Sequence, residues 1–240
     1  MRLAILTDIH GNVQALDAVL EQLDEQGVTD IWCLGDMIAM GPDSNEVMAR
    51  LLDRGVRMIT GNHDEAVLSL LEGRGHPASY AHTRPHHEWV ARTLRPDYAD
   101  ALFQLPRTIE EQVGTERVYG IHYHIPIEKR QATILEEPFH EILEATLPNM
   151  QRLYGEYDAD IVCFGHHHPV HVFEDAAKRY VNPGALGVAR DDLARYGLLS
   201  YDENGFAIDL RAVPYDKQAF MERMERFDVP QREVMFHLFY

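Results

Sequence analysis

The chain begins MRLAILTDIH (residues 1–10), in which an apolar run from Leu3 to Leu6 leads into Asp8 and His10. An apolar run of this length predicts a buried β-strand. Similar runs recur at residues 31–34, 56–59, 118–121 and 161–164. Amphipathic, helix-forming stretches lie between the first runs, so we expect βαβ units and a mainly parallel sheet.

Side chains that bind metals in proteins follow all five apolar runs. They are Asp8, His10, Asp36, Asn62, His63, Asp64, His122, His166 and His168. The carboxyl ends of strands in an open α/β sheet meet at one crevice, so we expect these side chains to converge. Residues two apart in an extended segment project to the same side. This pairs Asp8 with His10 and His166 with His168, while His167 should point away.

The chemistry of these side chains indicates which metals they would hold. Apart from His63 and Asp64, they comprise two carboxylates, one amide oxygen and four imidazoles, without a thiolate, which favours Mn, Fe, Zn or Ni over Mg or Ca. Seven ligands are too many for one small ion and suit two divalent ions that share a carboxylate. The competing interpretation is that these are ordinary turn residues after strands. Five motifs in order, each after a strand, favour the metal centre.

Together the motifs resemble those of the calcineurin-like metallophosphoesterase superfamily. They are Asp8-x-His10, Gly35-Asp36, Gly61-Asn62-His63-Asp64, His122 and Gly165-His166-x-His168. Residues 182–187 (NPGALG) resemble a stretch in the small bacterial phosphodiesterase branch of that family. The resemblance covers about residues 1–215. It implies a single α/β domain over 1–240, a four-layer αββα sandwich of two mixed sheets flanked by helices. A small helical cap would be inserted at 65–110, and a C-terminal helix and tail would occupy 216–240.

The resemblance also implies a role for each motif residue. Asp8, His10 and His168 would bind the first metal, and Asn62, His122 and His166 the second. Asp36 would bridge the two ions with one oxygen to each. His63 would stabilise or protonate the leaving oxygen, and Asp64 would orient His63. Tyr123 stands where the family usually has a small residue, so His124 stays open as an alternative to His122.

By resemblance we expect a phosphoester hydrolase in which a hydroxide bridging the metals attacks phosphorus in line. Phosphodiesters are favoured over monoesters by family analogy. The alternatives are a nucleotide or dinucleoside-polyphosphate hydrolase, a phosphomonoesterase, and a non-catalytic metal-binding scaffold. The scaffold is disfavoured because the chain keeps every metal ligand and the leaving-group histidine.

The composition limits the partners. Twenty-two Lys and Arg against 39 Asp and Glu give a net charge of −17, which argues against nucleic-acid polymers and anionic membranes. No apolar stretch reaches the ~20 residues that span a bilayer, so we expect a cytoplasmic protein. By resemblance, its partner would be a small phosphoester substrate, such as a nucleotide. Cys33 and Cys163 lie in apolar runs and are expected to pack in strands.

Two segments keep two interpretations each. Residues 73–95 are locally basic, and Arg84, His86 and His87 would either contact substrate phosphates or form a solvated helix face. The aromatic tail with Phe236, Phe239 and Tyr240 would either pack on the domain or form a homo-oligomer contact.

Local signals predict the remaining elements. Asp43 and Glu46 predict a capping box, and Asp97 is expected to cap a short helix. A helix is expected to begin near Val67. Further helices are predicted over 137–154 and 216–227, and a β-hairpin over 198–213 with Asn204 in its turn.

Overall fold

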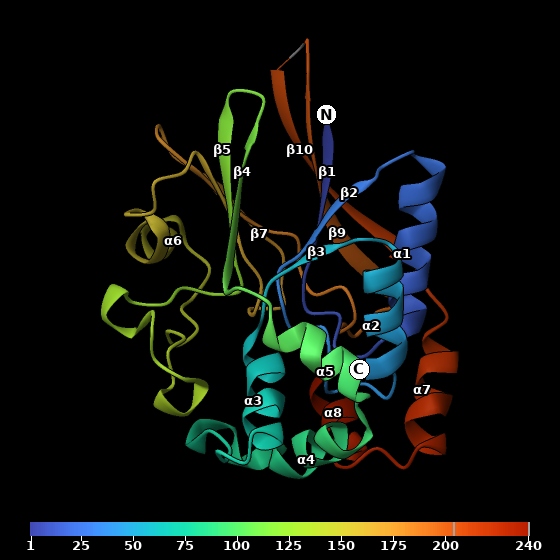
Figure 1. The fold of residues 1–240 in the computed structure, drawn as a ribbon. Coiled ribbons are helices and arrows are strands. Elements are labelled where there is room, and N and C mark those ends of the chain that lie inside the picture. Colours follow the sequence, from blue (N-terminus) through green and yellow to red (C-terminus); the bar gives the residue numbers. More distant parts are fainter. Residues whose placement is uncertain (204, 240) are drawn as a thin grey trace.

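The computed structural model describes the backbone of residues 1–203 and 205–239, with side chains in that part as far as residue 237. Two five-stranded sheets lie face to face (Figure 1). The first has the order β10 (Gly205–Pro214), β9 (Leu193–Asp202), β1 (Arg2–Leu6), β2 (Asp30–Cys33) and β3 (Arg57–Met58). The second has the order β4 (Thr108–Val113), β5 (Glu116–Ile121), β6 (Ile161–Cys163), β8 (Arg179–Asn182) and β7 (His171–Glu174).

Both sheets are mixed. The strands β1, β2 and β3 run parallel, while β9 and β10 are antiparallel to their neighbours. In the second sheet β5, β6 and β8 are parallel, and β4 and β7 form antiparallel edges. The parallel strands at the centre of each sheet bring their carboxyl ends to the same side of the molecule.

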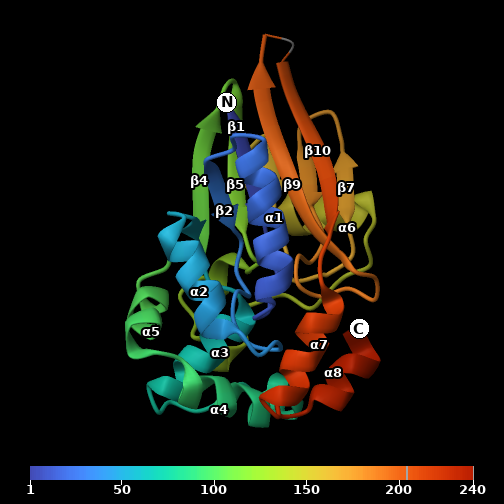
Figure 2. The ribbon, with the colours of Figure 1, turned by 90° about the vertical axis from the view of Figure 1, so that its right-hand side faces the viewer.

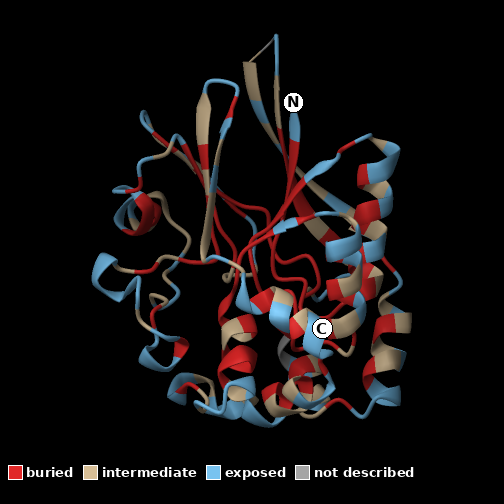
Figure 3. Ribbon diagram, viewed as in Figure 1, coloured by how far each residue is buried: buried red, intermediate tan, exposed pale blue. Residues whose placement is uncertain are grey.

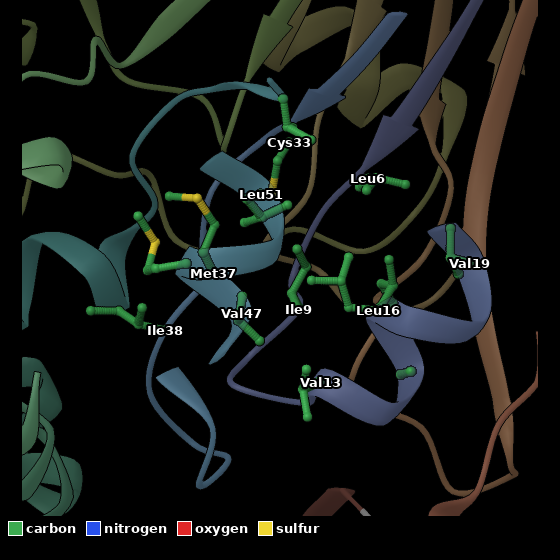
Figure 4. Close-up of a cluster of buried hydrophobic side chains, with 14 of the residues drawn as sticks. Leu6, Ile9, Val13, Leu16, Val19, Cys33, Met37, Ile38, Val47 and Leu51 are labelled. Atoms are coloured by element: carbon green, nitrogen blue, oxygen red, sulfur yellow. The ribbon is translucent and has the colours of Figure 1, made fainter. Parts of the chain in front are cut away.

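Strand β1 shows how the layers are built. Leu3 and Ile5 pack in the apolar cluster between the two sheets, whereas Ala4 and Leu6 belong to the cluster beneath the helices. This alternation is the two-residue period of a strand buried on both faces. The helices α1 (Val13–Glu25), α2 (Ser44–Asp53) and α7 (Lys217–Arg226) cover the first sheet, and Figure 4 shows part of their core. Helix α6 (Leu147–Tyr154) packs against the second sheet. The four-layer prediction is confirmed.

A group of short helices lies at the carboxyl ends of the strands (Figures 1 and 2). It contains α3 (Asn62–Leu71), the 3₁₀ helix η1 (Ala78–Thr83), α4 (Arg84–Thr93), α5 (Pro96–Phe103) and α8 (Arg232–Phe239). We call η1 and α4 the cap. The 3₁₀ turns η2 (Ile127–Lys129) and η3 (Ile134–Glu136) precede α6. Figure 3 shows buried residues concentrated along the central strands and the loops that leave them. Among the described residues, no helix is both long enough and apolar enough to span a membrane.

Several local predictions were wrong. Asp43 immediately precedes α2 but makes no side-chain capping bond, because Arg223 of α7 binds its carboxylate through Nε at 2.8 and 2.9 Å. Arg95, rather than Asp97, precedes α5, since Pro96 already occupies the first turn and Asp97 pairs with Arg95. The last three residues of the 65–110 segment belong to β4.

Two helix boundaries also differ from the predictions. The helix expected over 137–154 forms only at 147–154, where Thr146 caps it and Pro148 lies in its first turn. Helix α3 begins at Asn62 rather than near Val67, because the Asp64 carboxylate accepts the Gly61 N–H at 2.9 Å. The hairpin formed by β9 and β10 is confirmed, although Asn204 lies outside the described residues. Strands β4, β7 and β8 had not been predicted.

Candidate metal centre and active site

The loops that leave the strands are joined by backbone hydrogen bonds. Asp8 N–H donates to Gly35 O at 3.1 Å, and His10 N–H donates to Asp36 O at 2.9 Å. A Cβ at Gly165 would lie 1.9 Å from Thr7 Oγ1, and one at Gly61 would lie 2.2 Å from Asp36 Oδ1. Only glycine fits at these two positions, and its absent side chain is what lets the loops approach each other.

Four of the metal-binding candidates have left-handed backbone conformations. The φ angles are 53° at Asp8, 50° at His10, 52° at Asp36 and 66° at His166. Non-glycine residues adopt this region at a cost of roughly 1–3 kcal/mol each, and such strain gathers at functional sites. The surrounding hydrogen bonds and packing therefore hold these side chains in place against their local preference.

The first predicted ligand group is brought together. Donor atoms of Asp8, His10 and His168 lie within 4.8 Å of one another. The Nε2 atoms of His10 and His168 are 3.3 Å apart, and each lies 3.7 to 3.8 Å from Asp8 Oδ1. The Asp8 carboxylate accepts hydrogen bonds from Thr7 Oγ1 and from His166 N–H, which fix its orientation.

The second predicted group lies beside the first. Donor atoms of Asp36, His122 and His166 also lie within 4.8 Å of one another. The amide group of Asn62 is within 3.3 Å of Asp36 Oδ2, His122 Nε2 and His166 Nδ1. His122 Nδ1 lies 2.8 Å from Leu34 O, so this nitrogen donates to the carbonyl and directs Nε2 into the group. Metal-binding histidines usually have such an outer partner.

Asp36 stands between the two groups. Its Oδ2 is 3.8 Å from His10 Nε2 and 3.3 Å from His122 Nε2. Its Oδ1 accepts the backbone N–H of His63 at 2.8 Å. One oxygen of Asp36 therefore faces a histidine of each group.

We call the two groups, with Asp36 between them, the Asp36 cluster, and its electrostatics suit divalent cations. Burial raises the pKa of Asp8 and Asp36, but the facing histidines outweigh it and lower both, so the carboxylates are ionised at neutral pH. Burial lowers the pKa of His166 to about 3 and of His168 to about 4, which leaves neutral rings. Burial also acts on His122, but the charge of Asp36 outweighs it and raises that pKa to about 9. Cation binding would displace a proton held there. The donor set thus fits divalent cations.

His63 adjoins the cluster but has a partner of its own. Its ring lies 5.1 Å from the His10 ring, and a donor atom of His63 lies within 4.8 Å of those of His10 and Asp36. His63 Nδ1 is 2.8 Å from His87 Nε2, and His87 Nδ1 is 2.7 Å from His76 Nε2. Three imidazoles thus form a hydrogen-bonded chain from the cap to the cluster.

The expected contact between Asp64 and His63 is not made, which corrects that prediction. The buried Asp64 carboxylate instead accepts four backbone N–H groups, from Asp36 at 2.8 Å, Gly61 at 2.9 Å, and Met37 and Ile38 at 3.1 Å. Asp64 therefore fixes the loop that carries Asp36. His87 is the side chain that orients His63, and the sequence signalled it only through the gathering of histidines at 76–87.

Other candidate residues lie in different places. His124 bonds to Tyr157 Oη at 3.2 Å, away from the cluster that contains His122. His167 points away as expected and bonds to His171 at 2.7 Å. Arg84 pairs with Glu88 at the surface. His86 is buried, and its Nε2 accepts the Met40 N–H at 2.6 Å.

Comparisons with known proteins agree with this geometry. A family model described as the calcineurin-like phosphoesterase superfamily domain matches residues 1–204. An uncharacterized protein of Methanocaldococcus jannaschii is 27% identical over 95% of this chain and 94% of its own length. The solved structure of a metallophosphoesterase from Sphaerobacter thermophilus has a TM-score of 0.72 at 22% identity and covers 98% of this chain and 97% of that chain.

A shorter similarity involves enzymes with a specified substrate. The symmetrical bis(5'-nucleosyl)-tetraphosphatase of Erwinia tasmaniensis is 40% identical to this chain over 74 residues. That stretch is 30% of this chain and 27% of the tetraphosphatase.

Proposed function

Because this chain belongs to the calcineurin-like phosphoesterase superfamily and is a hydrolase acting on phosphoester bonds, we propose that it works with two divalent ions held at the Asp36 cluster. Asp8, His10 and His168 would hold one ion, and Asn62, His122 and His166 the other, with Asp36 shared. When bound, such ions polarise the phosphoryl oxygens and lower the pKa of water. Mn, Fe, Zn or Ni would suit the imidazole-rich donor set.

His63 would act on the leaving oxygen. Burial is the main reason that its pKa is lowered to about 3, so its ring is neutral at neutral pH. With His87 Nε2 donating to Nδ1, the neutral His63 ring would carry its hydrogen at Nε2 and would stabilise the leaving oxygen by a hydrogen bond as the P–O bond breaks, while that oxygen takes its proton from water. His87 holds the ring in this tautomer, as a second-layer partner does for a catalytic histidine.

The observation that carries the proposal is the position of Asp36 Oδ2, which lies 3.8 Å from His10 Nε2 in one group and 3.3 Å from His122 Nε2 in the other. The test compares metal content and activity in wild type, Asp36→Asn and the surface control Asp17→Asn. Each protein is stripped with a chelator, reloaded with Mn²⁺, and assayed on bis(p-nitrophenyl) phosphate and p-nitrophenyl phosphate. We expect Asp36→Asn to lose bound metal and activity together. Full activity or two retained ions in that variant would contradict the shared ligand.

The substrate class is proposed from family analogy, with diesters ahead of monoesters. A second candidate is hydrolysis of dinucleoside polyphosphates, favoured by the 40% identity to the tetraphosphatase stretch. Diadenosine tetraphosphate would be offered to the Mn²⁺-loaded protein and its products separated. Symmetric cleavage faster than diester cleavage would favour this candidate. Metal binding without hydrolysis of any of these esters would instead indicate a scaffold.

A further inference from the structure

A pocket of about 150 Å³ opens beside His63 and His168. The cap supplies one side of it through Tyr80 and Thr83, and helix α8 supplies another through Val234 and Met235. Figures 1 and 2 show α8 next to the cap, at the carboxyl ends of the strands. A group bonded to a phosphate at the Asp36 cluster would enter this pocket.

The described lining of the pocket contains no carboxylate, ammonium or guanidinium group. None of its lining residues within the described part of the chain is Asp, Glu, Lys or Arg. Two of its histidines are already engaged, because His86 Nε2 accepts the Met40 N–H and His87 bonds through both ring nitrogens to His63 and His76. Burial also lowers the pKa of His86 and His87, which keeps them neutral. An anionic group would lose its hydration here without gaining a partner, so the occupant is uncharged.

The size and shape of the pocket fit a single ring. A cavity of about 150 Å³ is large enough for benzene, and Met40, Val234 and Met235 line this pocket together with its histidines. The Tyr80 ring lies 5.9 Å from the His63 ring at an interplanar angle of 33°, so both present aromatic surface. One six-membered ring therefore fits, whereas a fused pair of rings would extend outside.

The wall formed by α8 lies beyond residues 1–204, the part that matches the family model. Gln231, at the start of this helix, donates from Nε2 to the His82 carbonyl and so ties α8 to the cap. One wall of the pocket is thus formed by a segment outside the part that matches the family model.

We propose that this pocket binds a single uncharged six-membered aromatic ring of the substrate, either a pyrimidine base or an aryl group. The proposal rests on the phosphoesterase function proposed above. It assigns Val234 and Met235 as residues that determine specificity, and it places the phosphate outside the pocket, at the Asp36 cluster.

The test measures binding as well as turnover. Phenylphosphonate, naphthylphosphonate and methylphosphonate are titrated calorimetrically into Mn²⁺-loaded wild type, Val234→Trp and Met235→Trp. Ile127→Trp, at an exposed position away from the pocket, is the control. We expect wild type to bind phenylphosphonate about tenfold more tightly than methylphosphonate, or ~1.4 kcal/mol, with no further gain for naphthyl. The preference should vanish in both pocket variants and persist in the control.

Val234 is 54% exposed, so its tryptophan variant should fold even if Met235→Trp does not. Circular dichroism shows whether each of the two tryptophan variants is folded. Equal binding of phenyl and methyl compounds by wild type, or an unchanged preference in folded Val234→Trp, would overturn the proposal. Cytidine 5'-monophosphate is then tested as a competitor of phenylphosphonate. If it competes with wild type and competes less well with Val234→Trp, the ring is a pyrimidine base. If it does not compete with wild type, the ring is an aryl group. Failure of the proposed function would appear as a lack of ester hydrolysis. The ring preference is measured by binding, so it can be tested even if no ester is hydrolysed.

Discussion

Replacing Asp64 with Asn should destabilise the protein without removing any proposed metal ligand. In the structure Oδ2 accepts N–H groups from Asp36 and Gly61, and Oδ1 accepts those of Met37 and Ile38. An amide keeps one acceptor oxygen and turns an NH₂ toward the other two donors. Each buried donor left without an acceptor costs about 1–3 kcal/mol, so we expect a loss of roughly 2–6 kcal/mol. For a chain of this size each kcal/mol shifts Tm by about 2–4 °C.

The assay is urea unfolding of chelator-treated protein, followed by circular dichroism, so that metal binding does not contribute. It is run at pH 8.5, because burial raises the pKa of Asp64 to about 7 and the wild-type group must be a carboxylate. Asp17→Asn is the matched control, since Asp17 forms an exposed pair with Arg50 and should cost less than about 1 kcal/mol. An Asp64→Asn protein within about 0.5 kcal/mol of wild type, the usual range for surface changes, would refute the assignment of Asp64 as the support of the Asp36 loop.

Three further predictions concern the surroundings of the site. His87→Ala should leave metal content unchanged but lower kcat about tenfold for substrates with alkyl leaving groups and less for those that release nitrophenol. His87→Gln should restore part of the lost kcat. Equal losses of kcat for both leaving groups would contradict the role of His87 at His63. Arg223→Ala leaves the buried Asp43 carboxylate unpaired and should cost about 2–4 kcal/mol in urea unfolding, whereas an unchanged midpoint would show the pair to be dispensable. Burial lowers the pKa of His86 to about 3, so the unfolded chain takes up its proton near pH 6.5 while the folded chain does not. The free energy of unfolding of wild type should therefore fall relative to that of His86→Asn as the pH drops from 6.5 toward 4, by up to about 1.4 kcal/mol per pH unit. Parallel plots of unfolding free energy against pH for the two proteins would contradict this prediction.

The sequence predicted the parts of this protein in which local pattern and global fold agree. The apolar run from Leu3 to Leu6 forms the predicted strand, and parallel strands bring Asp8 and Asp36 to the same edge of the sheet. The role of Asp64 could not be read in the same way, because its four donors are backbone groups with no sequence signature. The pairing of His87 with His63 depends on how the cap lies over the sheets, which is set by tertiary packing. Strands β7 and β8 were missed because they are only four residues long and follow the last histidine motif closely.

The arrangement of β1 has a consequence for synthesis on the ribosome. This first strand occupies the centre of its sheet, and Leu3 pairs with Leu199 on its antiparallel side. Until that late segment emerges, one edge of β1 has no partner, and His166 and His168 follow only shortly before it. Pairings of such long sequence separation fold slowly. The nascent chain therefore carries an open strand edge, prone to pair with other chains, from the synthesis of β1 until that of β9. The two candidate ligand groups can come together only after His166, which follows Asp8 by 158 residues, has been synthesised.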